Sequence, residues 1–518
     1  MKKFYEQAEQ ILAGMTLEQK IGQMVMASIE VTEMDDKTRA FLRDNHVGNV
    51  ILFGKNCDNR AQLAKLNADI QDEVTSYTNG VQALLSIDQE GGFVTRIHNG
   101  ATVFPSASAI GSFGDPDLAY LAGHIMGNEM RALGIAYNLA PVLDSSKELV
   151  RLRNFGKTAE EAAIYGGAYA RGLRDTGVID CGKHFPGCGD SVIDTHFATS
   201  IIRTPAETLI EQSVKPFQQV VNEGMCSIMT SHCCYVNLYD EEIPATLSKN
   251  ILQKLVREEM GFEGLIISDG MQMLSIADVY GAPKGCVMAT EAGCDLVIVG
   301  NGGENADPNG SDVQVPCIKA MIEAVGTGEL SMERVNDSVR RIIAYKLMLG
   351  DMYPAADVVT RDWSAHEAFA QKLAEMGVKV LRDDINLLPI PEGALYMSRK
   401  ARHRMGVAEG DKLATSFASM AARICGGEAV EFEDHPDLEA LKEKIEKAPA
   451  VVVSADYGYE ILNLKEDIRA ICQLNPKTCY VNLSVPEDTR FYDFVPCVVS
   501  SFDSTTNAIR EVCKVLKG

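Results

Sequence analysis

Residues 183–196 carry side chains that can transfer protons. Their sequence, KHFPGCGDSVIDTH, places five ionisable residues around a loop rich in proline and glycine: Lys183, His184, Asp190, Asp194 and His196. A carboxylate two residues before an imidazole, as in Asp194 and His196, can hold one ring nitrogen and leave the other free for proton transfer. The alternative is an ordinary loop whose ions pair with one another. So many ionisable groups after an apolar strand favour an active-site loop.

Asp269 is a candidate nucleophile at the end of another apolar run. The sequence LIISDG over residues 265–270 places this carboxylate at the tip of a buried strand, where Gly270 leaves space beside it. No lysine or arginine is close to Asp269 in the sequence, so a local ion pair does not explain it. Asp269 could instead cap the following helix, which is a common role for aspartate.

These residues need elements that bring distant parts of the chain together. Eight apolar runs alternate with helix-like segments, at residues 21–29, 47–53, 81–88, 138–143, 178–185, 225–231, 265–269 and 294–299. Amphipathic segments lie at residues 60–75, 116–133, 159–176, 205–223, 248–260 and 316–326. Continuous apolar strands alternating with helices predict the α/β class, and eight such units in order predict a closed (β/α)8 TIM-type barrel.

Polar residues follow the predicted strands, at Asp88-Gln89-Glu90, Asp144, Lys183-His184, Ser231-His232 and Ser268-Asp269. In such a barrel the active site forms at the carboxyl ends of the strands, so we expect these groups to meet at one mouth. Polar residues also mark where strands stop. That explanation does not account for the predominance of carboxylates, imidazoles and a lysine over ordinary turn residues.

The pattern predicts two domains. We expect the barrel over residues 1–350, a linker over 351–363, and a smaller three-layer α/β domain over 364–518. Its strands are expected at residues 378–381, 394–397, 450–453, 478–483 and 497–501, and its helices at 364–376, 411–425, 436–447, 464–474 and 505–516. It has neither a GxGxxG motif nor a nucleophile elbow, so its sequence indicates no separate chemistry.

Composition narrows the class of partner. The formal net charge of -23 opposes binding to nucleic acid or to anionic membrane surfaces, which favours a small or neutral substrate. The 14 cysteines include no CxxC pair, which is typical of reduced thiols in a cytoplasm. The N-terminal residues have acids and glutamines where a signal peptide is apolar, and no run is long enough to span a bilayer. We therefore expect an untargeted cytoplasmic protein.

Several segments share their residues and their order with a known enzyme family. They are DQEGGFVTR at 88–96, NLAPVLD at 138–144, RNFG at 153–156, residues 183–196, PATLS at 244–248 and Ser268-Asp269. Together they resemble glycoside hydrolase family 3, and specifically its β-N-acetylglucosaminidase (β-hexosaminidase) branch. The resemblance covers the predicted barrel, and residues 374–388 are similar to the start of that family's second α/β domain.

The resemblance implies a retaining, exo-acting β-N-acetylglucosaminidase that forms a covalent glycosyl-aspartate intermediate. Asp269 is then the nucleophile, and His196 is the proton donor and later the base, oriented by Asp194. The implied sugar-binding residues are Asp88, Arg96, Arg153, Lys183 and His184. A retaining glycosidase needs a nucleophile and an acid/base group, which is usually a second carboxyl group, so a histidine removes one negative charge from the site. The resemblance implies no metal and no cofactor.

The chain departs from the family pattern at a few positions. Cys188 stands where the family often has a second histidine, Asn154 stands where it has a serine, and the approach to Arg153 through Arg151 is not the usual one. Cys188 is flanked by glycines without an adjacent charged base, which favours a structural role over a reactive one. The departures leave the catalytic pair intact and the leaving-group preference open.

Other functions stay open from the sequence. A metal-dependent barrel hydrolase could use as ligands His184, Asp190, Asp194, His196 and His232, although no HxH or HExxH motif occurs. A sugar-binding protein without activity would be attractive had Asp269 or His196 been lost. Within the enzyme class, a β-glucosidase or a phosphorylase is possible on the same scaffold, since a histidine acid/base does not repel phosphate. The natural substrate (a cell-wall muropeptide met in cell-wall recycling, a chitin fragment or a glycan) and the oligomeric state are not determined.

Overall fold

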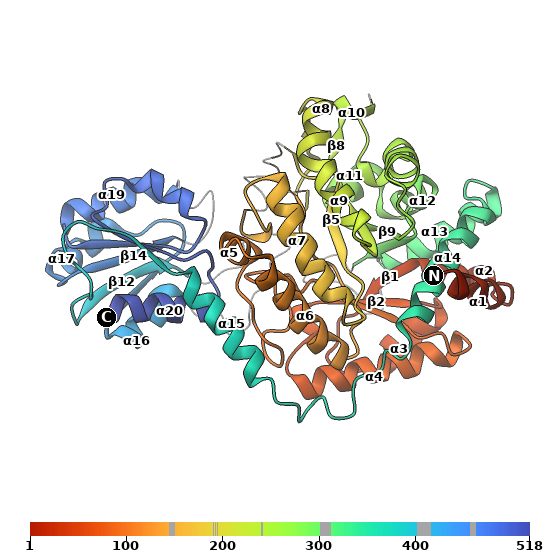
Figure 1. Ribbon diagram of the computed structural model, residues 1–518, viewed down its shortest axis with the longest axis horizontal. Helices are drawn as coiled ribbons and strands as arrows, with labels where there is room; N and C mark the ends of the chain where they lie inside the picture. The colour runs from red at the N-terminus through yellow and green to blue at the C-terminus, as the bar shows by residue number, and fades with distance from the viewer. Residues whose placement is uncertain are drawn as a thin grey trace.

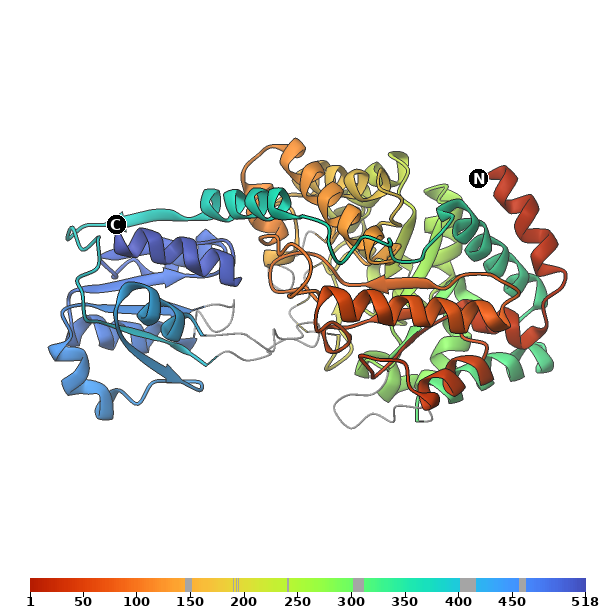
Figure 2. The same cartoon turned by 90° about the horizontal axis from the view of Figure 1, so that it is seen from below.

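The computed structural model describes residues 1–144, 151–189, 191, 193, 195–239, 242–300, 312–400, 416–455 and 463–518. Two α/β units lie side by side, and the helix α15 (Ser364–Gly377) bridges them (Figures 1 and 2). The larger unit is built on the eight-stranded sheet, the smaller on a six-stranded sheet. The N-terminus lies on the side of the larger unit that faces away from the smaller one (Figure 1).

The larger sheet forms a parallel barrel, as the sequence predicts. Its neighbouring strands run in the order β4-β3-β2-β1-β10-β9-β7-β5. They are β1 (Val25–Ser28), β2 (Asn49–Leu52), β3 (Leu84–Ile87), β4 (Tyr137–Asn138), β5 (Cys181–Phe185), β7 (Ser227–Thr230), β9 (Leu265–Gly270) and β10 (Leu296–Val299). Parallel bridges from Tyr137 to Ile179 and from Val142 to Lys183 close the circle between β4 and β5. Each of the eight predicted apolar runs overlaps one barrel strand, although β4 begins one residue before its run and β9 ends one residue after its run.

Helices cover the outside of the barrel. They are α1 (Lys2–Leu12), α2 (Leu17–Met24), α3 (Asp36–Asp44), α4 (Arg60–Tyr77), α5 (Ala107–Ser112), α6 (Pro116–Ala132), α7 (Ala159–Arg174), α8 (Ala206–Leu209), α9 (Lys215–Asn222), α10 (Val236–Tyr239), α11 (Leu274–Tyr280), α12 (Ala282–Ala292), α13 (Gln314–Thr327) and α14 (Met332–Leu349). Two π-helical segments are η3 (Ile210–Val214) and η5 (Asn250–Glu259). Short 3₁₀ turns are η1 (Gly54–Asn56), η2 (Arg151–Arg153) and η4 (Ala245–Leu247), and β6 (Ile201–Ile202) pairs with β8 (Cys234–Tyr235).

The first predicted strand begins too early. Residues 21–24 belong to α2, not to the strand. The side chain of Thr16 accepts a hydrogen bond from the backbone N–H of Gln19, whose side chain bonds back to Thr16, so a capping box starts this helix. The fully buried end of α2 continues directly into the fully buried β1, so hydrophobicity alone does not separate the two elements.

The smaller unit is a three-layer α/β domain. Its strand order is β11-β16-β15-β14-β12-β13, in which only the pairing of β11 with β16 is antiparallel among the described strands. The strands are β11 (Lys379–Asp383), β12 (Ala394–Arg399), β13 (Gly427–Phe432), β14 (Val451–Ala455), β15 (Thr478–Asn482) and β16 (Cys497–Ser500). The helices are α16 (Phe417–Cys425), α17 (Leu438–Lys447), α19 (Lys465–Leu474) and α20 (Thr506–Lys517), with the 3₁₀ segment η6 (Pro486–Tyr492).

Both faces of this second sheet are covered. One apolar cluster joins alternate strand residues such as Val452 and Val481 to α16 and α20, and another joins Val451 and Tyr480 to α17 and α19. The edge strand β13 is not predicted from the sequence, because it has mostly exposed and half-buried residues and so carries little of the apolar signal. The helix predicted at 411–425 is observed from Phe417, with Ser416 as its N-cap, and residues 411–415 lie outside the described part of the chain.

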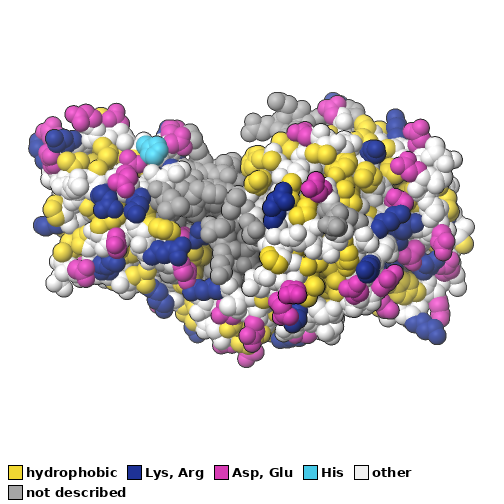
Figure 3. All heavy atoms as spheres, turned by 90° about the horizontal axis from the view of Figure 1, so that it is seen from above, with side chains coloured by type: hydrophobic (Ala, Val, Ile, Leu, Met, Phe, Trp, Pro, Cys, Tyr) yellow, Lys and Arg dark blue, Asp and Glu magenta, His cyan; other side chains and the backbone are white. Residues whose placement is uncertain are grey.

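The two units meet through polar contacts near the barrel mouth. Arg151 forms a buried ion pair with Asp488 of η6, and Lys157 pairs with Glu487. Ser106, the N-cap of α5, donates a hydrogen bond of 2.6 Å to the carbonyl of Phe502. On the face shown in Figure 3, acidic and basic side chains are interspersed over both units. Among the described residues, no helix is both long and apolar enough to cross a bilayer.

Candidate active site

Charged and polar side chains gather where the barrel strands end. Asp88 directly follows β3, Lys183 and His184 belong to the last residues of β5, His232 follows β7 and Asp269 lies in β9. Parallel strands in one barrel direct their carboxyl ends to the same side, so residues that are 181 positions apart in sequence meet at one mouth. The structure therefore brings together the strand-end residues that the sequence predicted.

A buried ion network forms one side of this mouth. The Lys183 ammonium lies 2.6 Å from Asp88 Oδ1 and 2.7 Å from Glu90 Oε1. The guanidinium of Arg153 donates two hydrogen bonds to Glu90, of 2.9 Å from Nε and 2.8 Å from Nη2. Arg96 Nη2 lies 3.5 Å from Asp88 Oδ2. Three cations thus surround two buried carboxylates, so each carboxylate has cationic partners that offset the cost of burying its charge.

The ion pairs shift the pKa values of the charged groups in this network. Burial raises the pKa of Glu90, but the charges of Arg153 and Lys183 outweigh it and leave the pKa well below its usual range. Burial lowers the pKa of Lys183, yet Asp88 and Glu90 raise it above the ordinary value. Lys183 therefore stays an ammonium donor at neutral pH instead of acting as a base.

The loop after β3 places Arg96 above Asp88. The side-chain oxygen of Gln89 accepts hydrogen bonds from the backbone N–H groups of Arg96 (3.0 Å) and Ile97 (3.2 Å), which closes the loop. Asn138 in β4 holds Gln89 in turn, because its amide exchanges hydrogen bonds with the backbone of Gln89 at 3.0 and 2.8 Å. Gly92 has a φ of +59°, and a side chain there would lie 2.8 Å from the Cβ of Ser106.

Arg96 keeps donors that the described protein atoms do not use. Its side chain is 2% exposed, and its Nε and Nη1 atoms have no hydrogen-bond partner among the described residues. A buried donor without a partner is costly, by about 1–3 kcal/mol. Donors of this kind at the barrel mouth are suited to a ligand that brings its own hydroxyl oxygens.

Asp269 occupies the end of β9 as a half-buried carboxylate. Its Oδ1 accepts a hydrogen bond of 2.7 Å from the backbone N–H of Gly270. Burial raises the pKa of Asp269, but the charges of His232, His184 and His196 lower it, and the net pKa is below the usual value. The following helix α11 has no side-chain N-cap, so the capping alternative is wrong. The carboxylate is ionised and oriented without a lysine or arginine partner in the described part of the chain.

His232 bonds to the backbone of the residue that follows Asp269. Its Nδ1 lies 2.8 Å from the hydroxyl of Thr246, and its Nε2 lies 3.1 Å from the carbonyl oxygen of Gly270. Burial lowers the pKa of His232 below its usual value, although the charge of Asp269 raises it. Since both ring nitrogens have partners in the protein, His232 does not fit the ligand set of a metal-dependent hydrolase. It fixes the backbone next to the carboxylate instead.

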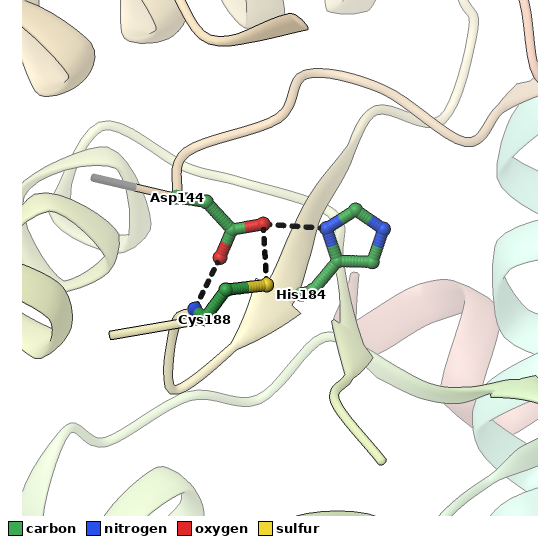
Figure 4. A group of neighbouring side chains, drawn as sticks. All are labelled: Asp144, His184 and Cys188. Atoms are coloured by element: carbon green, nitrogen blue, oxygen red, sulfur yellow. Dashed lines mark hydrogen bonds and ion pairs between the residues drawn. The ribbon is translucent and has the colours of Figure 1, made fainter. Parts of the chain in front are cut away.

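His184 is turned toward Asp144 by an irregularity in β5. The register between β5 and β7 shifts between Lys183 and Phe185, and His184 adopts a left-handed φ of +118°. A bulge of this kind redirects a side chain, and strained backbone of this kind clusters at functional sites. The result is a contact of 2.6 Å between His184 Nδ1 and Asp144 Oδ2 (Figure 4).

Cys188 completes this group from the loop after β5. Its backbone N–H donates to Asp144 Oδ1 at 3.0 Å, and its thiol lies 3.4 Å from Asp144 Oδ2 (Figure 4). A hydrogen bond to Cys233 and burial raise the pKa of the Cys188 thiol well above its usual value. Asn154 also contacts Asp144, since its side-chain amide donates a hydrogen bond of 3.2 Å to the backbone carbonyl of Asp144. The two departures from the family pattern, Cys188 and Asn154, thus share one partner.

Two of the ionisable residues in the predicted acid/base loop lie outside the described part of the chain. They are Asp190 and Asp194, so the pairing of Asp194 with His196 stays a prediction. His196 itself is half-buried, and its charge is one of those that lower the pKa of Asp269. The role of His196 as the acid/base group therefore also stays a prediction.

The sequence reasoning missed some members of the site. Glu90 stands in a strand end that the sequence singled out, yet no role was assigned to it, and it accepts hydrogen bonds from both Arg153 and Lys183. Asp144 and His232 were noted only as polar strand ends or possible ligands. Their partners come from other strands, so spacing along the chain carries no signal for those contacts.

Comparison with known proteins places this geometry in a family. Residues 16–345 match the family model of the glycosyl hydrolase family 3 N-terminal domain. A β-hexosaminidase from Thiobacillus denitrificans is 32% identical over 292 residues, which cover 55% of this chain and 79% of that protein. One from Neisseria meningitidis serogroup A is 30% identical over 371 residues, or 69% of this chain and 96% of that protein.

The likeness extends to a solved structure with both units. The glycoside hydrolase family 3 β-N-acetylglucosaminidase from Paenibacillus sp. str. FPU-7 superposes with a TM-score of 0.86 at 30% identity. It covers 98% of this chain, and this chain covers 97% of it. The family model spans more than half of the 518 residues and contains the barrel mouth described above. The chain therefore belongs to glycosyl hydrolase family 3.

Proposed function

We propose that this protein is a retaining, exo-acting β-N-acetylglucosaminidase that removes terminal β-linked N-acetylglucosamine through an ester on Asp269. The observation that carries the proposal is the Asp269 carboxylate: it ends a barrel strand, it is kept ionised by neighbouring imidazoles, and it has no permanent cation as a partner in the described part of the chain. A carboxylate in this state can attack an anomeric carbon. The β-hexosaminidase relatives support N-acetylglucosamine as the sugar.

The reaction proceeds in two displacements. In the first, Asp269 attacks the anomeric carbon while His196 protonates the leaving oxygen, and the aglycone departs. In the second, His196 takes a proton from water as the water oxygen attacks the same carbon, and Asp269 is released. Asp194 orients the imidazole and favours its protonated form through its charge.

The ion network would bind the sugar hydroxyls. Arg96 offers two buried donors, and Lys183 and Asp88 lie beside it as a charged donor and acceptor. Hydrogen bonds to charged partners are the stronger ones, at about 1.5–3 kcal/mol each. Arg153 gives two donors to Glu90, so its main contribution is to hold Glu90 and through it Lys183. His184 would contact the sugar from β5.

Covalent trapping tests the proposal. A slow fluorinated N-acetylglucosaminide should label the peptide that carries Asp269, as seen by mass spectrometry after digestion. Asp269→Ala should abolish both labelling and turnover, because it removes the carboxylate that forms the ester. Asp278→Ala, a change to an exposed carboxylate in the neighbouring helix α11, should leave both intact. A label on another peptide, or full turnover in Asp269→Ala, would remove the assignment.

The sugar and the acceptor are tested with small substrates. Among nitrophenyl glycosides, the N-acetyl-β-glucosaminide should be cleaved faster than the β-glucoside. Free N-acetylglucosamine should be the product with or without phosphate in the buffer. Formation of a sugar phosphate would instead make the protein a phosphorylase.

A further inference from the structure

A group of three possible metal ligands lies beside the proposed nucleophile. Asp144, His184 and Cys188 each present one ligand atom, and these atoms lie within 4.8 Å of one another (Figure 4). They come from separate segments: Asp144 from the end of the β4 segment, His184 from the bulge in β5, and Cys188 from the loop that follows it. Their backbones are held independently of any ion, because the Cys188 N–H bonds to Asp144 Oδ1 at 3.0 Å.

The spacing of the ligand atoms fits a tetrahedral ion of the size of zinc. At the usual bond lengths of such an ion, sulfur and oxygen ligands lie about 3.5 Å apart and nitrogen and oxygen ligands about 3.3 Å apart. The thiol of Cys188 is 3.4 Å from Asp144 Oδ2, a distance that already matches the spacing of sulfur and oxygen ligands around such an ion. His184 Nδ1 is 2.6 Å from the same oxygen, a hydrogen-bond distance that must open by about 0.7 Å on metal binding.

The ligand types select among cations. A thiolate, an imidazole and one carboxylate suit borderline-soft divalent ions such as Zn²⁺ or Co²⁺, whereas Mg²⁺ and Ca²⁺ prefer oxygen ligands alone. Three protein ligands leave the fourth position of the ion open to solvent or to another ligand. Cys188 supplies the soft ligand of this group.

We propose that Asp144, His184 and Cys188 bind a soft divalent cation such as Zn²⁺, and that the bound ion inhibits the enzyme. On binding, the Cys188 thiol loses its proton to solvent, and His184 offers Nδ1 as a lone pair with its proton on Nε2. The ion then occupies His184, a residue of the proposed sugar site, and adds positive charge near Asp269. The binding stands on the geometry alone, while the inhibition rests on the proposed function.

Binding is tested by spectroscopy without any substrate. Co²⁺ added to the metal-free full-length protein should give a thiolate-to-cobalt charge-transfer band at about one ion per chain, and Zn²⁺ should displace it. Cys188→Ser should lose the band and bind Zn²⁺ at least about tenfold more weakly. The matched control Cys472→Ser, which removes a half-buried thiol from α19, should behave as wild type. An unchanged band or unchanged Zn²⁺ affinity in Cys188→Ser would overturn the proposal.

A second variant guards against a folding defect. Cys188→His keeps a zinc ligand but removes the sulfur, so it should bind Zn²⁺ without the charge-transfer band. Inhibition is measured as the Zn²⁺ concentration that halves the turnover rate of each variant. This concentration should rise at least about tenfold in Cys188→Ser and in no other variant. Metal binding without inhibition would reject the inhibitory part and keep the site. Absence of glycosidase activity would reject the proposed function and leave the spectroscopic test standing.

Discussion

At the residue scale, the site keeps one carboxylate charged without pairing it to a permanent cation. Imidazoles from His232, His184 and His196 lower the pKa of Asp269 against the effect of burial. A lysine or arginine in contact with Asp269 would stabilise the carboxylate more strongly and so make it a poorer nucleophile. The permanent cations are instead committed to Asp88 and Glu90, where they can orient a sugar.

The role of His196 can be separated from binding by the choice of leaving group. His196→Ala should reduce turnover of an alkyl or sugar aglycone by roughly 10²–10⁴-fold, because these groups need protonation to depart. Nitrophenolate needs little protonation, so its first displacement should be nearly unaffected. Steady-state and burst kinetics on both substrates measure this difference. Equal losses on the two would argue against proton donation by His196.

At the element scale, β10 is tied to the surrounding helices by one buried carboxylate. Asp295, at the start of this strand, is fully buried and accepts hydrogen bonds from Arg257 of η5 and from Arg334 and Arg341 of α14, at 2.7–2.8 Å. Burial raises the pKa of Asp295, but the three arginines lower it far more. The carboxylate therefore joins three segments at the end of the barrel opposite the active site.

Removing this carboxylate should destabilise the barrel and change its acid unfolding. Asp295→Asn leaves buried arginines without their partner, so the free energy of unfolding should fall by roughly 3–5 kcal/mol, measured in urea. Asp337→Asn, a change to a partly exposed partner of the same arginines, should cost about 0–1 kcal/mol. The comparison identifies the burial of Asp295 as the cause of the larger loss of stability. Equal decreases in the free energy of unfolding of the two variants would contradict this explanation.

The pH dependence follows from the sign of the shift. The pKa of Asp295 is lower in the folded protein than in the unfolded chain. The stability that this carboxylate gives to the fold is therefore complete above its pKa in the unfolded chain, about 3.9. It is lost progressively as the pH falls below that value. Wild type should therefore lose stability more steeply than Asp295→Asn between about pH 5 and pH 2.

At the scale of the whole molecule, the second domain reaches the barrel mouth through η6. Asp488 of η6 is 1% exposed and pairs with Arg151. Arg151 shares the turn η2 with Arg153, which holds Glu90 with two hydrogen bonds. Two groups of ion pairs, one between Asp488 and Arg151 and one among Arg153, Glu90 and Lys183, are thus joined through the short turn η2. We infer that the second domain positions the sugar-binding network through this contact.

This role gives a prediction about substrate binding. Asp488→Ala should raise KM about tenfold and change kcat little, because the network contributes equally to substrate and transition state. Asp488→Glu, which keeps the charge, should restore most of the loss. Glu487→Ala removes the exposed pair with Lys157 at the same contact and should change KM less than about twofold. An effect of equal size in both alanine variants would mean that η6 only attaches the domains.

The sequence by itself determined the architecture. Each barrel strand overlaps a short apolar run that is followed by polar residues, and the second domain shows the same local pattern around its central strands. Burial on both faces of a parallel sheet produces that pattern directly, so it is readable without contacts. The prediction fails at the edge strand β13, where the apolar pattern is weak, and at the junction of α2 with β1, where buried residues run on from the helix into the strand.

Only the tertiary structure decided the partners within the site. Lys183 pairs with Asp88 and Glu90, across 95 and 93 positions of the chain, and His184 reaches Asp144 because a bulge in β5 redirects its side chain. The thiol of Cys188 joins the same carboxylate. Such contacts depend on strand register and local backbone conformation, which bring together residues from separate segments. Residue types mark the mouth of the barrel, but the fold selects which charges neutralise one another and which remain for the substrate.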